Sequence, residues 1–351
     1  MTVKVGVVGC GWWATTAHLP AVLEHPDAEL AAIAEPLDEN RLRCERAFSP
    51  QHVFCDAASM LAEAELDAVV VATPHAHHYA PAASALARGL NVLVEKPMVL
   101  DPAQGRALCD LATENACQLI VGYPWHYNDQ VVKLRDEIHA GRIGVIEHLS
   151  STYASTARQL YRGHPGLLKD TLGFALAQPQ ATSYSDPEIA GGGQGQTQLT
   201  HSAALCLFLT DLRIRSVQAS TARFELDVDL ADAVAVRFDG GAIGSLDSVG
   251  SVQPGQEEIC EVRIFGDSGH ILLDAVGGRA SIHGPGTVVD ELLPLAEEAR
   301  YPERAPANNL IDVTLGADTN GSPGVLGLRV VELLDAMYTS ARQGRPVKVA
   351  A

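Results

Sequence analysis

The stretch Val3–Ala14 reads VKVGVVGCGWWA, and it determines how the first part of the chain folds. The β-branched run Val3–Val8 predicts a buried strand, and a glycine turn followed by a predicted helix comes directly after it. In this order the pattern GxGxxA is typical of a dinucleotide-binding turn. Gly9 permits the tight bend, Gly11 lets the backbone approach a pyrophosphate, and Ala14 lets the helix pack against the strand.

The same turn indicates where a nucleotide would lie. Trp12 and Trp13 open the predicted helix, whose free amides would hold the pyrophosphate. Glu35 closes the next apolar run, where an acid can bind the ribose hydroxyls of NAD and repel the extra phosphate of NADP. The sequence therefore favours NAD. Arg41 and Arg43 lie close by and keep NADP open, and a solvated Glu35 is the simpler alternative.

Strands and helices alternate up to about residue 122, which predicts a doubly wound parallel sheet of the Rossmann type. The expected strands are Val3–Val8, Leu30–Ala34, Ala68–Ala72, Asn91–Val94 and Gln118–Val121. The expected helices are Ala17–Glu24, Glu39–Ala47, Ala57–Ala64, Tyr79–Arg88 and Pro102–Asn115. We take residues 1–122 as one domain.

Residues 123–351 predict a second α/β domain. Alternating segments follow one another with Gly, Asp and Asn turns between them, which indicates one mixed or antiparallel sheet. The expected strands are Ile146–Thr156, Val217–Leu226, Ala233–Phe238, Ala242–Gly250, Glu258–Phe265 and His270–Leu273. The expected helices are Val131–Ala140, Thr197–Leu209 and Gly324–Gln343, the last of which could pack back on the first domain.

Two segments that follow expected strands carry polar side chains toward the carboxyl edge of the parallel sheet, where such folds bind ligands. The first contains Thr73, Pro74, His75 and His78. Three histidines within four residues raise a metal hypothesis, but the segment has no acidic or cysteine partner. We expect a loop beside the nucleotide and no metal site.

The second segment is Glu95-Lys96-Pro97, directly after the strand Asn91–Val94. Lys96 could donate a hydrogen bond to a substrate hydroxyl, and partial burial would lower its pKa enough for proton transfer. Taken alone, it could equally be a surface lysine. Glu95 and Pro97 are expected beside the cofactor.

A glycine-rich turn, Gly191–Gly195, leads into a predicted helix that carries Thr197 and His201 on one face. A neutral imidazole there could take a hydroxyl proton as hydride leaves the adjacent carbon. The alternative is a structural histidine. Trp125, His126 and Tyr153 are candidates for the pocket wall, although each could also lie in the core.

Together these motifs resemble the glucose–fructose oxidoreductase, inositol dehydrogenase and rhizopine-catabolism family (Gfo/Idh/MocA). The resemblance implies a Rossmann domain and a C-terminal domain whose large, mostly antiparallel sheet is open on one face and used for oligomerisation. It also implies NAD(P)-dependent oxidation of a secondary hydroxyl on a sugar, cyclitol or similar polyol. Lys96 and His201 match two of the family's catalytic positions, and Trp125 is expected against cofactor and substrate.

Three positions depart from the family pattern. Thr197 stands where an aspartate is frequent, His75 where an asparagine is common, and Gly122–Tyr127 lacks the usual Asn and Arg. A threonine cannot act as a carboxylate base, although it can hydrogen-bond a substrate hydroxyl. These changes predict an altered substrate pocket.

We therefore expect His201, assisted by Lys96, to remove the proton from the hydroxyl. Two alternatives remain: a redox-neutral enzyme that keeps NAD tightly bound, and a nucleotide- or sugar-binding protein that has lost catalysis. Weaker pocket candidates precede the glycine turn, and an arginine among them would suit an acidic substrate: Arg158, Tyr161, Arg162 and His164.

Composition limits the partners. The formal net charge of −18 opposes binding to nucleic acid and to anionic membranes. No apolar stretch is long enough to span a bilayer and the N-terminus carries no targeting signal, while the seven scattered cysteines fit reduced thiols. We expect a cytoplasmic homodimer or homotetramer that pairs through its C-terminal sheet.

Overall fold

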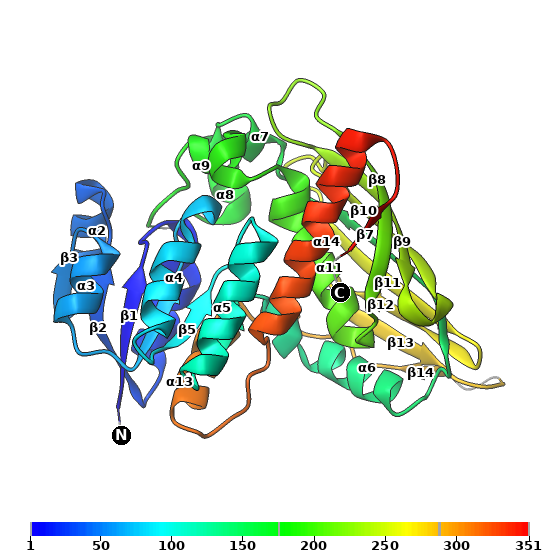
Figure 1. Cartoon of the computed structure of the whole chain (residues 1–351), viewed down its shortest axis with the longest axis horizontal. Helices are drawn as coiled ribbons and strands as arrows, with labels where there is room; N and C mark the ends of the chain where they lie inside the picture. The colour runs from blue at the N-terminus through cyan, green and yellow to red at the C-terminus, as the bar shows by residue number, and fades with distance from the viewer. Residues whose placement is uncertain (1, 175, 287–288, 350–351) are drawn as a thin grey trace.

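The computed structural model describes residues 2–174, 176–286 and 289–349. A six-stranded parallel sheet forms the N-terminal part, with the order β3-β2-β1-β4-β5-β6 (Figure 1). Its strands are β1 (Val3–Val8), β2 (Ala28–Ala34), β3 (His52–Phe54), β4 (Ala68–Val71), β5 (Asn91–Val94) and β6 (Leu119–Val121). This is the doubly wound order of dinucleotide-binding folds, in which ligands bind where the strand order reverses, here between β1 and β4.

Helices cover both faces of this sheet, so its central strands are apolar throughout; all four residues of β4 are buried. A π-helical turn, η1 (Ala14–His18), leads into α1. The other helices of this part are α1 (Leu19–Glu24), α2 (Asp38–Phe48), α3 (Ala57–Glu63), α4 (Tyr79–Leu86) and α5 (Pro102–Glu114), with a 3-10 turn η2 (His75–His77).

The second sheet has nine strands, in the order β14-β13-β12-β11-β7-β10-β9-β8-β15. Neighbours pair antiparallel except β7 with β10, which run parallel. The strands are β7 (Ile146–Ala154), β8 (Ile214–Ala222), β9 (Ala231–Phe238), β10 (Ile243–Val249), β11 (Ile259–Gly266), β12 (Gly269–Asp274), β13 (Arg279–His283), β14 (Val289–Glu291) and β15 (Val347–Lys348).

One face of this sheet is covered by α6 (Asp129–His139), α11 (Thr200–Thr210) and α14 (Gly324–Gln343) (Figure 1). Residues alternate between the two faces, as β9 shows: Val234 and Val236 are buried, whereas Ala235 and Arg237 are exposed. The sequence therefore builds an open-faced sheet.

The C-terminal chain contacts both parts of the molecule. Helix α13 (Ala305–Thr314) adds Leu310 and Ile311 to the core under the first sheet. Helix α14 lies against α5 on one side and β8 on the other. We propose the boundary at residues 122/123, with residues 305–314 completing the N-terminal core.

Short helices connect these elements: η3 (Pro124–Tyr127), α7 (Arg158–Tyr161), η4 (Pro165–Leu168), α8 (Lys169–Leu172), α9 (Thr182–Ser185), α10 (Pro187–Ala190), a π-helical turn η5 (Gly195–Leu199), η6 (Asp239–Gly241) and α12 (Glu297–Arg300). Across the described ranges, none of the helices combines the length and apolar character that a membrane crossing requires.

Several elements differ from the expectation. Strands β13, β14 and β15 and helix α13 were not predicted, and two further differences have a plain physical reason. Strand β3 was not predicted, because its three residues are only half-buried or exposed and carry no clear pattern. Strand β8 ends at Ala222, four residues before the expected end, because the chain turns at Phe224 with φ 55°.

Candidate active site

A cleft of about 910 Å³ is lined by both parts of the molecule. Most residues that the sequence singles out lie on its wall: Gly9, Gly11, Trp12, Trp13, Glu35, Thr73, Pro74, His75, His78, Glu95, Lys96, Trp125, Tyr153, Thr197 and His201. They come from the carboxyl edge of the parallel sheet and from η5, α11 and β7. The fold thus brings together residues as far apart in the chain as Gly9 and His201.

The glycine turn forms one end of the cleft. Gly9 has φ +88°, and a Cβ atom there would lie 2.7 Å from the carbonyl oxygen of Ala72. A Cβ on Gly11 would meet no atom within 4 Å, so its backbone faces open space. This is the shape that a pyrophosphate on a helix N-terminus requires, and these residues fit a dinucleotide.

Glu35 is buried at the edge of this end. Its carboxylate accepts hydrogen bonds from the amides of Cys10 (2.8 Å) and Leu37 (3.0 Å), which leaves other lone pairs for ribose hydroxyls. Arg41 and Arg43 pair with carboxylates of their own helix α2 and are absent from the cleft wall. The arrangement favours NAD.

Glu95 contacts His18 and the backbone amide of Lys96. Its Oε1 lies 2.8 Å from Nε2 of His18, and its Oε2 accepts from the amide of Lys96 at 3.1 Å. Burial alone would raise the pKa of this carboxyl, but His18 and the charge of Lys96 hold that pKa below its usual value. Gly122 makes the arrangement possible, since a Cβ there would lie 2.4 Å from Oε1.

Lys96 joins the two parts of the molecule. Its Nζ donates a hydrogen bond to the carbonyl oxygen of Thr197 at 3.0 Å. Burial lowers the pKa of Lys96 to about 8, against the opposing charge of Glu95. A lysine with this pKa exists in both protonation states near neutral pH, which suits proton transfer.

His201 is 5% exposed and is surrounded by aromatic rings. Burial, followed by the positive charge of Lys96, holds the pKa of His201 well below its usual value. The imidazole is therefore neutral at working pH. Ring centroids 5.8–6.2 Å away belong to Tyr123, Trp125, Tyr153 and Tyr301.

Several buried polar atoms of the cleft wall have no hydrogen-bond partner among the described residues. They are Trp12 Nε1, Thr73 Oγ1, Trp125 Nε1, Thr156 Oγ1 and Thr197 Oγ1. Buried polar groups are nearly always satisfied, and these five belong to residues from both parts of the molecule that line the same cleft.

The histidine-rich loop is held by backbone carbonyls. His75 Nδ1 lies 2.9 Å from the oxygen of Ala190, and burial lowers the pKa of His75 to about 3. His78 contacts the oxygens of Pro97 and Thr73, at 2.9 and 2.8 Å. Among the described residues, no three His, Cys, Asp or Glu side chains are arranged to hold a metal ion.

The structure places two candidates off the cleft wall. Pro97 supports His78 through its carbonyl. His126 points away because neighbouring side chains of η3 diverge: Trp125 faces the cleft, whereas the ring of His126 stacks on Phe208 with 4.3 Å between centroids.

The weaker candidates also lie elsewhere. Arg158 and Arg162 both pair with Glu225, and Tyr161 donates to Gln194. These three residues and His164 are absent from the cleft wall. The arginines therefore give no support to an acidic substrate.

Asp229 and Tyr338 were not predicted from the sequence, although they hold the turn that carries Thr197. The Asp229 carboxylate accepts hydrogen bonds from the amides of Gly193 (2.8 Å) and Gly195 (2.7 Å), and from the hydroxyl of Tyr338 (2.9 Å). A Cβ on Gly193 would lie 2.0 Å from the Asp229 carbonyl oxygen. The glycines are thus required for packing on Asp229, which no local sequence signal reveals.

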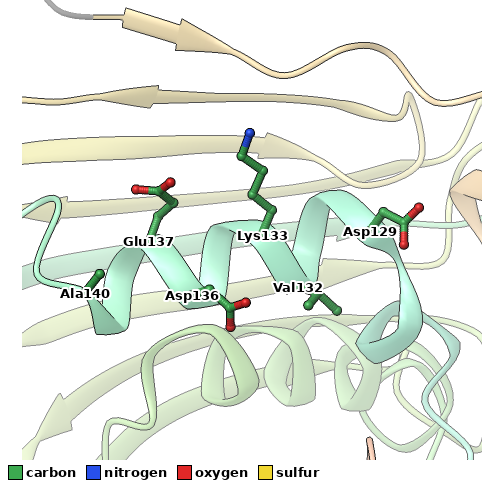
Figure 2. Close-up of a pocket in the computed structure, with 6 residues that line it drawn as sticks. All are labelled: Asp129, Val132, Lys133, Asp136, Glu137 and Ala140. Atoms are coloured by element: carbon green, nitrogen blue, oxygen red, sulfur yellow. The ribbon is translucent and has the colours of Figure 1, made fainter.

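A second hollow lies on the outer side of α6 (Figure 2). Its lining comes from that single helix: Asp129, Val132, Lys133, Asp136, Glu137 and Ala140. Charged side chains on one helix face, without an opposing wall, form a solvated surface.

Comparison with known proteins identifies the two parts. Residues 3–123 match the model of an oxidoreductase family with an NAD-binding Rossmann fold, and residues 131–272 match the GFO/IDH/MocA C-terminal domain. The rhizopine catabolism protein MocA of Rhizobium meliloti is 33% identical over 141 residues, which are 40% of this chain and 44% of that protein. The alignment thus covers less than half of this relative.

Solved structures resemble the whole chain. GenD2 from gentamicin A biosynthesis, in complex with NAD, is 25% identical with a TM-score of 0.81 and covers 100% of this chain and 97% of its own. Levoglucosan dehydrogenase, in complex with NADH and levoglucosan, has a TM-score of 0.83 at 20% identity, with full coverage of both chains, and supports the fold.

The glycine turn, Glu35 and the strand order define an NAD-binding Rossmann protein of the oxidoreductase class. Within that class, the chain belongs to the Gfo/Idh/MocA family.

Proposed function

We propose that this protein oxidises a secondary hydroxyl of a sugar, cyclitol or related polyol by transferring a hydride to NAD. The observation that carries the proposal is one continuous cleft, which runs from the glycine turn to Lys96 and His201. NAD, when bound, supplies the hydride acceptor. The names of the similar proteins, which include a dehydrogenase in complex with NADH and levoglucosan, support this substrate class.

Lys96 is the better proton acceptor of the two candidate groups. A general base works best when its pKa is close to the working pH, and the pKa of Lys96 is about 8. Burial, and then the charge of Lys96, holds the pKa of His201 well below its usual value. We therefore reverse the roles expected from the sequence. Neutral Lys96 takes the hydroxyl proton, and neutral His201 orients the same hydroxyl by a hydrogen bond.

Thr197 takes part through its backbone. Its carbonyl oxygen positions Lys96, so an aspartate side chain at this position is not needed for that contact. Its hydroxyl is buried and lies close to the side chain of Tyr161. The threonine therefore alters the pocket without removing the proton acceptor.

The rate of oxidation should depend on pH through Lys96. Because neutral lysine is the active form, kcat/KM should rise about tenfold per pH unit below the pKa of about 8 and level off above it. Reduction of the product needs the protonated form, so its kcat/KM should fall above the same pH. Initial rates of oxidation and of reduction, measured across this pH range, check the prediction. If kcat/KM changed with pH in the same direction for both reactions, the prediction would be contradicted.

Glu35 should set the choice of cofactor. Wild-type protein should bind NADH more tightly than NADPH. In Glu35→Gln the ratio of the Kd for NADPH to the Kd for NADH should fall by about tenfold, because a negative charge facing the 2′-phosphate is lost. Quenching of tryptophan fluorescence measures both affinities. Glu45→Gln, an exposed position on α2, is the control; an unchanged ratio in Glu35→Gln would count against this role.

A screen of sugars, cyclitols and sugar acids with NAD and NADP in parallel tests the proposal. Continuous NADH formation from at least one polyol is the expected result. If NADH formation stopped at one molecule of NADH per protein chain, the redox-neutral alternative would be favoured. Binding of NADH and sugars without any turnover across the panel would favour a binding protein.

We further propose that the protein pairs through the outer face of its nine-stranded sheet and works in the cytoplasm. Ile243, Phe265 and Leu272 are 48%, 38% and 37% exposed on that face, and their burial would stabilise a dimer or tetramer. All seven cysteines are unpaired, which fits a reducing compartment. Light scattering gives the oligomeric state.

A further inference from the structure

Asp232 is a buried acid that the proposed mechanism does not use. It lies near the start of β9 and is 4% exposed. Among the described residues, neither of its carboxyl oxygens has a hydrogen-bond partner. Ser248, which pairs with it across β10, donates its hydroxyl to the carbonyl oxygen of Tyr153. Because buried carboxyl groups are nearly always hydrogen-bonded or paired, Asp232 requires an explanation.

The group beside Asp232 is a second acid, Asp229, and the two side chains lie within hydrogen-bond reach of each other. Asp229 already accepts hydrogen bonds from the amides of Gly193 and Gly195. It accepts a third from the hydroxyl of Tyr338. Hydrogen bonds from donors favour the ionised form of a carboxyl group, so Asp229 is the carboxylate of the pair and Asp232 is free to keep a proton.

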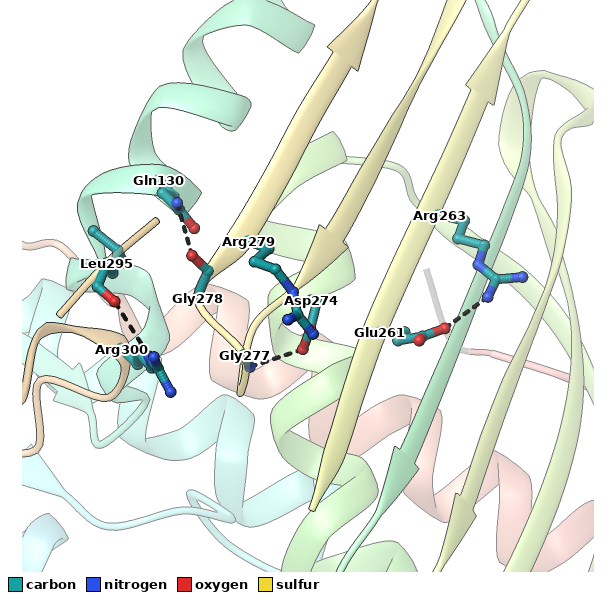
Figure 3. Close-up of polar contacts among 9 residues, drawn as sticks. All are labelled: Gln130, Glu261, Arg263, Asp274, Gly277, Gly278, Arg279, Leu295 and Arg300. Atoms are coloured by element: carbon teal, nitrogen blue, oxygen red, sulfur yellow. Dashed lines mark hydrogen bonds and ion pairs between the residues drawn. The ribbon is translucent and has the colours of Figure 1, made fainter. Parts of the chain in front are cut away.

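No positively charged group offsets Asp232 within the described part of the chain. Arg237, on the same strand, lies exposed on the opposite face of the sheet. Other arginines of this sheet pair with acids of their own (Figure 3): Arg263 with Glu261, and Arg279 with Asp274. The two acids therefore have no cation to share.

The other titratable groups that face Asp232 are two phenols, Tyr161 of α7 and Tyr338 of α14. Burial raises the pKa of both phenols well above the usual value, so both are neutral. Burial, and then the charge of Asp229, holds the pKa of Asp232 well above its usual value. Two buried carboxyl groups in contact do not both ionise near neutral pH.

We propose that Asp232 remains a neutral carboxylic acid in the folded protein and donates its hydrogen to Asp229, so that the two acids share one proton. Asp232 is then a positioning residue. It steadies Asp229, which holds the turn before Thr197, and the carbonyl of Thr197 accepts the hydrogen bond from Lys96. The shared proton depends only on the fold, whereas its effect on Lys96 rests on the proposed function.

The shared proton gives stability a specific dependence on pH. In the unfolded chain Asp232 has an ordinary pKa of about 3.9 and is ionised near neutral pH, whereas the folded chain keeps the proton. Unfolding therefore releases one proton. The stabilising effect of this proton is complete at acid pH, and the unfolding equilibrium constant rises about tenfold per pH unit until the folded pair ionises.

The test is urea unfolding from about pH 5 to about pH 8, without NAD or substrate, for wild type and three variants. Asp232→Asn keeps an N–H donor for Asp229 but cannot ionise, whereas Asp232→Ala has neither donor nor charge. Asp227→Asn, at an exposed position of the same loop, is the matched control. Sodium, potassium and magnesium chlorides are compared at constant ionic strength.

The ratio of the wild-type unfolding constant to that of Asp232→Asn should rise about tenfold per pH unit, and Asp227→Asn should follow wild type. At about pH 5, Asp232→Ala should have an unfolding constant at least about tenfold larger than Asp232→Asn, because Asp229 loses a donor. Equal pH dependence in wild type and Asp232→Asn would overturn the inference. So would one salt that stabilises wild type alone, because a cation would then take the place of the proton.

Turnover of a substrate from the polyol screen tests the link to the site. Asp232→Ala should lower kcat about threefold or more with little change in KM, and Asp232→Asn should restore most of it. Equal kcat in these two variants and wild type would refute the positioning role. If the pH dependence of unfolding is found but no polyol yields NADH, the proposed function fails and the shared proton stands.

Discussion

Replacing Lys96 with methionine should lower kcat/KM for hydroxyl oxidation by about 100- to 10,000-fold, while NADH still binds. Methionine keeps the apolar stem of the lysine and removes the group that accepts the proton. The hydrogen bond to the carbonyl of Thr197 is lost as well. The remaining activity should no longer vary with pH around 8, since the titrating amine is absent.

Lys133→Met is the matched control, because this exposed lysine lies on the outer face of α6 (Figure 2). It should keep wild-type rates. Lys96→Arg separates positive charge from proton transfer, since an arginine stays protonated. If Lys96→Arg kept full activity and a rising pH profile, the proton would have another acceptor, and His201 would be the group to examine next.

Replacing Asp229 with alanine should lower the free energy of unfolding by about 2–6 kcal/mol. The change leaves two buried amides, those of Gly193 and Gly195, without their acceptor, and also frees the Tyr338 hydroxyl. Each buried donor without a partner costs about 1–3 kcal/mol. Urea unfolding followed by circular dichroism measures the change.

Asp227→Ala, at an exposed position two residues earlier, should change stability by less than about 0.5 kcal/mol. A second readout is kinetic. Because the Gly193–Gly195 turn carries Thr197, Asp229→Ala should lower kcat more than it raises KM, at temperatures where the protein is still folded. Equal stabilities of the two alanine variants would mean that the turn does not depend on Asp229.

The Rossmann half could be predicted from local patterns because its strands are continuous apolar runs and its turn needs glycines. Strand β4, buried along its whole length, is an example. Strand β3 could not be predicted, since its three partly exposed residues show no alternation of apolar and polar side chains. The second sheet was predicted from alternation, as in β9, whereas its open face was implied by the family resemblance. The pairing of β7 with β10 has no local signal.

In the candidate site, residues inside motifs were predicted, whereas those brought in by the tertiary fold were missed. Lys96 and Thr197 carry their own signals, and the structure joins them by a hydrogen bond. Glu258, Tyr301 and Asp229 come from a strand start, a short helix end and a loop with ordinary composition. Their proximity to the cleft depends on how the second sheet packs against the first. The same packing explains why His126 points away from the cleft although its neighbour Trp125 faces it.

Direct hydride transfer is the central claim, and one measurement addresses it. The best substrate from the polyol screen, carrying deuterium at the carbinol carbon, is incubated with wild-type protein and excess NAD, and the NADH is analysed by mass spectrometry and NMR. We predict NADH that accumulates well beyond one equivalent of protein and carries one deuterium at the reduced carbon of its nicotinamide ring. NADH without deuterium, or no NADH from any polyol in the presence of bound cofactor, would contradict the account.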